Sequence, residues 1–422
     1  MALRRGRENS SVPLTPLGLI FYTAAFAGCL ALTVRRPVYG LAALLACLPI
    51  AVASSVSGTT ITLPKVLLLA VLTGSLPRLR LLARMRAARP MFVAFGVMVT
   101  AIILTLVPST YHANTLRETA KWIEYGLLFA VVLLNHRGTS GEIAPARDDA
   151  VLRGAIFASI LVVCVSALAQ ELIGSPWQIV LRGAPATRIA GVLEGPNQLA
   201  AYLEVAIATV LAWNLRAPTT AGRWLLAVGA CTLVLTFSRA GIACAALAVA
   251  VILAFDRERP HEVLPALAGA CCGGAGVAAW WIAAPQLWHQ RAITWAYSGG
   301  LGDRSELWRA ALFFFRHHPL LGIGAGNYEL ELPRAGVYGV RTHANNWYLQ
   351  ALAEGGIVLF AATIGWIATT FASLARDARR SPWRLAALAA SVALVVHQCA
   401  DYLVFYPKVA EPWIALIALG ML

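Results

Sequence analysis

The sequence of 422 residues contains few charged residues. Only 13% of them are Asp, Glu, Lys or Arg, against roughly 25% in a typical soluble domain, while 59% are hydrophobic. Apolar stretches of about 18 or more residues recur from one end of the chain to the other, which is typical of transmembrane helices. A soluble helical protein would have to bury every one of these apolar surfaces away from water. The composition therefore excludes an ordinary soluble globular protein.

Several motifs of catalysis and metal binding are also absent. The chain has no Walker A motif for ATP, no GxSxG nucleophile elbow and no CxxC pair. Its eight cysteines all lie within apolar stretches, and no DxD pair lies where a metal-bound nucleotide sugar would need it outside the cytoplasm. We therefore expect no nucleotide, no cofactor, no structural or catalytic metal and no disulfide framework.

Acidic residues are fewer than basic ones, 20 against 34, and the net charge is +14. In a soluble protein this excess would suggest a nucleic-acid partner. Here the basic residues lie mostly in short connections between apolar stretches, as expected when positive charge stays on the cytoplasmic side of a membrane. We expect membrane lipids around the chain and no nucleic acid.

The apolar stretches predict an all-α, polytopic membrane protein of about 12 transmembrane helices. They cover residues 16–34, 37–55, 61–77, 91–107, 119–135, 152–173, 197–214, 223–238, 240–255, 263–284, 346–374, 384–403 and 409–422. We divide the chain into N-terminal helices (1–150), central helices with arginine motifs (151–284), an extramembrane loop expected to be catalytic (285–345) and C-terminal helices (346–422). Within that loop we predict an amphipathic helix with Leu307, Ala311, Leu312 and Phe315 on one face.

Five basic connections fall on the same side when the predicted helices are counted, and positive charge marks that side as cytoplasmic. They lie at residues 78–90, 135–153, 216–223, 256–262 and 376–384. The parity of the first 60 residues stays open, because residues 1–7 and Arg35–Arg36 are both basic. The opposite side receives residues 108–118, 174–196, the tight turn at Ser238–Arg239 and the loop 285–345.

That opposite side holds arginines where the charge rule does not expect them. They are Arg182, Arg188, Arg239, Arg304 and Arg341. A boundary arginine often anchors to lipid phosphate, and this reading fits Arg182 alone best. For Arg239 the turn "SRAG" is too tight for a solvated loop, and its small neighbours suit the close approach of a ligand. One guanidinium group can bind two phosphate oxygens at once. Together the arginines therefore favour a phosphate or pyrophosphate substrate.

His343 is the candidate for proton transfer, because histidine is the usual general base near neutral pH. A structural role is the alternative. If the following helix begins by residue 343, His343, Trp347, Gln350 and Glu354 share one face, which offers a base, an aromatic platform for a sugar and two polar groups. Asn197, Asn346 and Asp401 complete the candidate substrate-binding residues.

Two further features have structural alternatives that we favour. His397 lies within an apolar stretch near Asp401, and a structural pair is the simpler reading. The turn "GIGAGN" at 322–327 resembles a phosphate-binding loop, although short glycine-rich turns are common.

The set of motifs resembles the O-antigen ligase and polymerase superfamily of bacterial inner membranes. "GDRSELWRAALFFFRHHPLLGIGAGNYE" followed by "THANNWYLQALAEGGIVLF" is similar to its signature, and "RIAGVLEGPNQLAAYL" and "TFSRAG" fit two upstream patterns. The resemblance covers residue 150 to the end. One departure concerns the base. The family often has a histidine directly before the asparagine, where this chain has Asn345. His343 lies two residues before that position, and it is the base only if a histidine there can reach the acceptor.

The resemblance implies a glycosyltransferase with a helical bundle similar to membrane glycosyltransferases of the C type. It implies glycan transfer at the periplasmic face from undecaprenyl pyrophosphate to lipid A–core oligosaccharide, without a metal. On this reading Arg188, Arg239 and Arg304 hold the pyrophosphate and His343 activates the acceptor hydroxyl, with inversion at the sugar. We expect a cavity open sideways to the membrane, lined by the helices of the long loop.

Two alternatives stay open. A polymerase or a protein oligosaccharyltransferase of the same superfamily would share these motifs. A polyprenol-glycan transporter would use the arginines to escort a headgroup, but we find no paired Gly/Pro-broken helices in matching halves.

Overall fold

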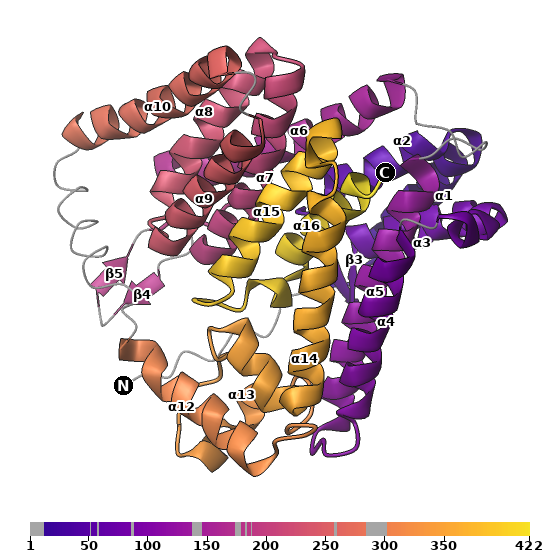
Figure 1. Cartoon of the computed structure of the whole chain (residues 1–422), viewed down its shortest axis with the longest axis vertical. Helices are drawn as coiled ribbons and strands as arrows, with labels where there is room; N and C mark the ends of the chain where they lie inside the picture. Colours follow the sequence, from indigo (N-terminus) through magenta and orange to yellow (C-terminus); the bar gives the residue numbers. More distant parts are fainter. Residues whose placement is uncertain are drawn as a thin grey trace.

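The computed structural model describes residues 12–50, 52–56, 59–85, 88–136, 146–173, 179–181, 184–186, 188–256, 260–283 and 302–422. These residues form helices almost throughout, with two small sheets, so the all-α prediction is confirmed (Figure 1). The first sheet consists of β1 (Val12–Pro13), β2 (Ala53–Val56) and β3 (Thr59–Thr62), and the second of β4 (Ile179–Leu181) and β5 (Ala184–Ala186).

Within the described residues, four helices are long and apolar enough to cross a membrane: α1 (Pro16–Arg35), α6 (Ala146–Ile173), α7 (Pro196–Arg216) and α14 (Trp347–Ala375). Shorter apolar helices accompany them, namely α2 (Pro37–Cys47), α4 (Arg89–Leu104), α8 (Thr220–Leu235), α9 (Arg239–Phe255) and α15 (Pro382–His397). The remaining long helices are α3 (Leu63–Ser75), α5 (His112–His136), α10 (Pro260–Ala283), α12 (Gly302–His317) and α16 (Pro407–Gly420). The figure of about 12 spans stays a prediction.

The helix boundaries follow ordinary start signals. Proline opens α1, α2, α7, α15 and α16, where its missing N–H costs nothing. Side-chain caps add the missing acceptors at other starts: Ser238 caps α9 and Asn346 caps α14. The loop residues before α9 and α14 are therefore held against the helix ends, which is where the candidate site residues lie.

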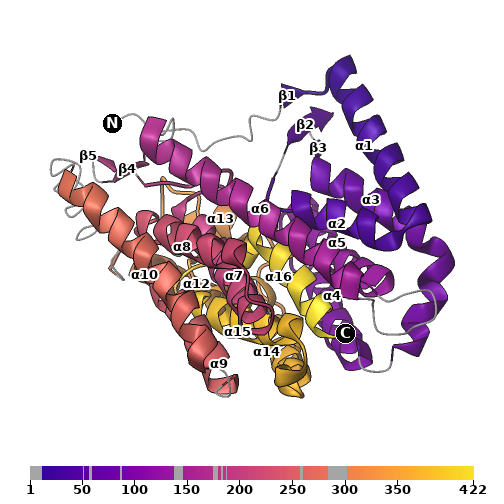
Figure 2. The same ribbon diagram turned by 90° about the horizontal axis from the view of Figure 1, so that it is seen from above.

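Helix α7 lies at the centre of the molecule, and 94% of the residues in its apolar 18-residue stretch are buried. It packs against α15, α9, α8 and α16. Figure 2 shows α1 at one edge of the molecule and α9 and α10 toward the other. The interior helix thus begins at Pro196, directly after the segment that carries Arg188.

The five basic connections gather at one end of the bundle, here called the basic end. The contacts that join them are Arg78–Asn135 (3.1 Å), Trp383–Asp149 (2.8 Å), Arg216–Asp256 (3.2 Å) and Arg216 to the Arg379 carbonyl (2.6 Å). Thr33 of α1 lies against Gly40 and Gly74 near the same end, so Arg35–Arg36 belong to it and β1 lies at the other. Among the described residues, Arg35–Arg36 thus lie at the basic end, and the membrane topology of the first 60 residues stays open.

The described part of the long loop packs as a separate small core against α14. Leu307, Ala310, Ala311 and Phe314 of α12 face it, and Tyr328 of α13 (Tyr328–Glu331) fills its centre. The predicted face was partly wrong, because Leu312 is 38% exposed. Five residues after Leu307, it is turned by about 140° from that residue on an α-helix.

The turn 322–327 does not form a phosphate-binding loop, because its backbone donors are used within the fold. Ile323 and Gly324 donate to the carbonyls of Ala353 and Glu354 at 3.0 and 2.9 Å. Ala325 donates to Thr105 Oγ1 at 3.0 Å. The turn instead holds the loop against α14 where that helix kinks at Gly356, which has φ 60°.

Candidate functional site

Arg188 lies in the segment before α7 and is held by two neighbours. Its Nε donates to the Thr236 carbonyl at 2.7 Å, and one terminal nitrogen donates to Asn197 Oδ1 at 3.0 Å. Asn197 in turn donates to Asp401 Oδ2 at 2.9 Å. This chain of contacts ties the end of α8, the start of α7 and the loop after α15 into one unit.

Arg304, in the first turn of α12, donates to the Ala400 carbonyl, next to Asp401. Three segments that are far apart in sequence therefore meet at the loop 398–402. Asp401 is 7% exposed, and its second oxygen accepts from the Tyr402 amide at 2.8 Å. The carboxylate is fixed on both sides and cannot swing away from the arginines.

The charges of three neighbouring groups act on Arg188. Burial lowers the pKa of Arg188 to about 10; the charge of Asp401 opposes this shift, and those of Arg239 and Arg304 add to it. We name Arg188, Arg239 and Arg304 the arginine cluster. Two like charges and one opposite charge act on Arg188, so the cluster carries excess positive charge that an anion would neutralise.

Arg239 is the first residue of α9 and follows Phe237, which has φ 54°. The helix N-terminus adds its own positive potential at this point. Gly241 has a structural role, since an added Cβ would meet Ala200 of α7 at 2.5 Å. Gly241 therefore allows α9 and α7 to pack closely. The close approach of a ligand to Arg239 stays a prediction.

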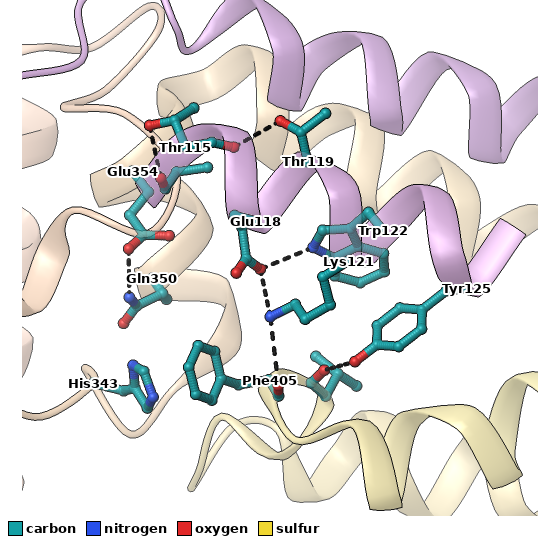
Figure 3. Close-up of polar contacts among 12 residues, drawn as sticks. Thr115, Glu118, Thr119, Lys121, Trp122, Tyr125, His343, Gln350, Glu354 and Phe405 are labelled. Carbon is teal, nitrogen blue, oxygen red and sulfur yellow. Dashed lines mark hydrogen bonds and ion pairs between the residues drawn. The ribbon is translucent and has the colours of Figure 1, made fainter. Parts of the chain in front are cut away.

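His343 lies just before α14, beside the ring of Phe405 (Figure 3). Its ring centre is 4.0 Å from that of Phe405 and 5.2 Å from that of Tyr402, and its side chain is 12% exposed. Nδ1 lies 3.0 Å from Glu329 Oε1, but off the line that a hydrogen bond requires. The imidazole is thus enclosed on most sides and meets one carboxylate.

Burial, with a further contribution from the charge of Lys121, lowers the pKa of His343 to about 3. The ring is therefore neutral at pH 7 and has a nitrogen lone pair available for a proton. A base of this strength is weak, so its main contribution in the ground state is orientation.

Lys121 and Glu118 of α5 are site residues that our reading of the sequence missed. Lys121 Nζ lies 2.7 Å from Glu118 Oε1 and 3.4 Å from the Phe405 carbonyl, and 4.2 Å from the centre of the Phe405 ring (Figure 3). A glutamate and a lysine three residues apart at the start of an apolar helix were the available signal.

Tyr406 connects the two halves of the site. Burial raises its pKa, and so do the charges of Asp401, Glu194 and Glu329. Its ring centre lies 6.3 Å from that of His343. Tyr406 is thus within electrostatic reach of Asp401 beside the arginine cluster and of Glu329 beside His343.

Residues 224–364 match the family model described as O-antigen ligase, Wzy_C. That segment is therefore similar to the O-antigen ligase family. It begins in α8, contains Arg239, Arg304 and His343, and ends within α14. No curated protein matches the chain at a significant level. The family resemblance read from the sequence is confirmed, and with it a coarse role as a membrane enzyme of O-antigen ligation or polymerisation.

The face predicted for the helix of this ligase-family segment is not formed as expected. Helix α14 begins at Trp347, and Asn346 Oδ1 caps it by accepting from the Leu349 amide at 3.0 Å. His343 is therefore outside the helix. Trp347 is 3% exposed and stacks on Trp122 with 6.2 Å between ring centres, so the structure buries it in the core, away from any sugar.

Glu354 and Asn346 make structural contacts. Glu354 Oε1 accepts from Gln350 Nε2 at 2.8 Å and from the Tyr328 amide at 3.1 Å. Asn346 Nδ2 donates to the Cys399 carbonyl at 2.8 Å. Both side chains hold the loop and α15 in place around His343.

The last two arginines are placed differently. Arg341 is exposed beside Glu329, at a cavity described below. Arg182 lies outside the described residues.

His397 pairs with Glu204 rather than with Asp401. The distance from Nδ1 to Glu204 Oε1 is 2.5 Å, and both side chains are buried. Cys244 lies close enough that the three could be considered metal ligands. The nitrogen and oxygen of the pair face each other, however, which favours a structural hydrogen bond.

The cavity along the helices of the long loop stays a prediction, but an apolar cavity lies between α4 and α14. Its volume is about 810 Å³, and Gly96, Ala101, Ala362 and Gly365 are among its small lining residues. An apolar chain fits such a cavity.

Proposed function

We propose that the protein is an O-antigen ligase. It transfers O-antigen polysaccharide from undecaprenyl pyrophosphate to lipid A–core oligosaccharide, at the periplasmic face of the bacterial inner membrane. The observation that carries this proposal is the arginine cluster beside Asp401, at the end of the bundle opposite the basic end.

The arginine cluster suits a pyrophosphate leaving group. Arg188 and Arg304 are fixed through backbone carbonyls, so their remaining N–H groups are pre-oriented. Negative charge grows on the pyrophosphate as the bond to the sugar breaks, and positive groups fixed in advance stabilise that charge without reorganisation. The apolar cavity between α4 and α14 would take the polyprenyl tail.

His343 acts on the acceptor. Its neutral ring orients the acceptor hydroxyl, and takes its proton as the new bond to the anomeric carbon forms and the bond to pyrophosphate breaks. The electron pair of the broken bond leaves with the pyrophosphate. A single displacement of this kind inverts the anomeric centre.

The test is transfer by the purified protein in detergent. It receives undecaprenyl-pyrophosphate-linked O-antigen and lipid A–core, with EDTA present. Lipid A–core capped with O-antigen, in inverted linkage, supports the proposal. Longer carrier-linked glycan without capping would instead identify a polymerase, and intact donor with no new glycosidic bond would favour a transporter.

A further inference from the structure

A second cavity has Glu329 in its lining, and His343 is not among its lining residues. Its volume is about 710 Å³, it is open to solvent, and it is lined by Tyr111, Glu329, Arg341 and the loop around Gly339. The lining includes no member of the arginine cluster. The proposed function therefore leaves this cavity without a role.

Glu329 connects the cavity to the candidate base. One of its oxygens lies 3.0 Å from His343 Nδ1, yet its side chain is 35% exposed against 12% for His343. Glu329 therefore belongs both to the lining of the cavity and to the contacts of His343. Burial raises the pKa of Glu329, and the nearby charge of Arg341 opposes that shift, so the two side chains share one electrostatic environment.

The cavity and the arginine cluster are made of different residues. Tyr406, whose ring centre lies 6.3 Å from that of His343, is within electrostatic reach of both Asp401 and Glu329. A donor with its pyrophosphate on the arginines would leave the side of Glu329 open. The second substrate of a transfer reaction has to enter from such a free side.

The side chains of the cavity suit a saccharide. Tyr111 is 41% exposed and offers a ring face for the apolar C–H surface of a sugar. Glu329 accepts hydrogen bonds from hydroxyl groups, and Arg341 donates to ring and hydroxyl oxygens. An apolar platform beside a few convergent polar groups is what a specific small-molecule site contains.

We propose that this cavity is the subsite for the acceptor saccharide, with Tyr111 as its platform, Arg341 as its donor and Glu329 directing a hydroxyl toward His343. The inference rests on the proposed function, because it assumes a transfer reaction.

The test separates binding from turnover. Lipid-free core oligosaccharide is titrated against the purified full-length protein, wild type and variants, by calorimetry. Tyr111→Ala and Arg341→Ala each weaken binding about tenfold, while Tyr111→Phe keeps the ring and most of the affinity. Tyr338→Ala, at a 74% exposed tyrosine of the same loop, and Arg316→Ala, at an exposed arginine of α12, serve as matched controls and leave binding unchanged.

The transfer assay supplies the second readout. Tyr111→Ala raises KM for the acceptor about tenfold and leaves KM for the donor unchanged, as expected when only acceptor binding is lost. Equal acceptor affinity and equal KM in wild type, Tyr111→Ala and Arg341→Ala would overturn the subsite while leaving a working ligase. A wild type that binds the oligosaccharide but forms no glycosidic bond would instead overturn the proposed function.

Discussion

Arg188 offers the sharpest test of the arginine cluster. Replacing it with alanine removes a guanidinium whose contacts to Thr236 and Asn197 fix its direction. A hydrogen bond to a charged group contributes about 1.5–3 kcal/mol, and about 1.4 kcal/mol corresponds to a factor of ten. One lost contact to the pyrophosphate therefore lowers kcat/KM by roughly 10- to 150-fold. Arg188→Lys keeps the charge without the planar fork, and an intermediate loss is expected.

The assay is glycan transfer with varied donor at saturating acceptor. Arg309→Ala is the matched control, because it removes an exposed arginine from the same helix as Arg304. Thermal unfolding of each variant shows whether the fold survives. Arg188→Ala with kcat/KM within twofold of wild type would refute the role of the cluster in binding the donor.

Three further predictions concern other parts of the molecule. Since the pKa of His343 is lowered to about 3, the ring stays neutral down to about pH 4, and kcat/KM shows no acid limb from this group between pH 5 and 7; a limb centred near 6.5 in the pH–rate profile would contradict this. Glu204→Leu leaves His397 buried without its partner and destabilises the protein by about 3–5 kcal/mol. The unfolding temperature of this single variant should therefore fall further than that of the double variant that also carries His397→Leu. Gly356→Ala forces a side chain into a backbone of φ 60° against the Leu320 carbonyl carbon, 2.4 Å from the added Cβ, and should destabilise by more than about 1 kcal/mol, whereas Gly365→Ala, which meets nothing within 4 Å, should not.

Most of what the sequence could predict came from the length of its apolar stretches and from the positions of the basic connections between them. Every predicted apolar stretch overlaps a helix of the structure. Counting the helices put Arg188, Arg239 and Arg304 on one side, and the structure brings their charges within reach of one another. Membrane sequences allow this because apolar length and basic connections reflect the bilayer directly.

The local geometry of the site could not be predicted, because it depends on tertiary contacts. His343 and Trp347 would share a face only if the helix began by residue 343, but the cap at Asn346 makes α14 begin at Trp347. Trp347 in turn points into the core, where it stacks on Trp122. Glu329 carries no distinguishing pattern in the sequence. Its role becomes visible only when the loop fold places it against His343.

The most direct test of the central claim is capping of lipid A–core by the purified protein, with His343→Ala and Arg239→Ala alongside wild type. We expect capped product from wild type in the presence of EDTA, and at least about 100-fold less from each variant, as is typical when a general base or a charge-stabilising donor is removed. Undiminished capping by both variants would contradict the site. Absence of capping by a folded wild type that binds donor and acceptor would contradict the ligase assignment itself.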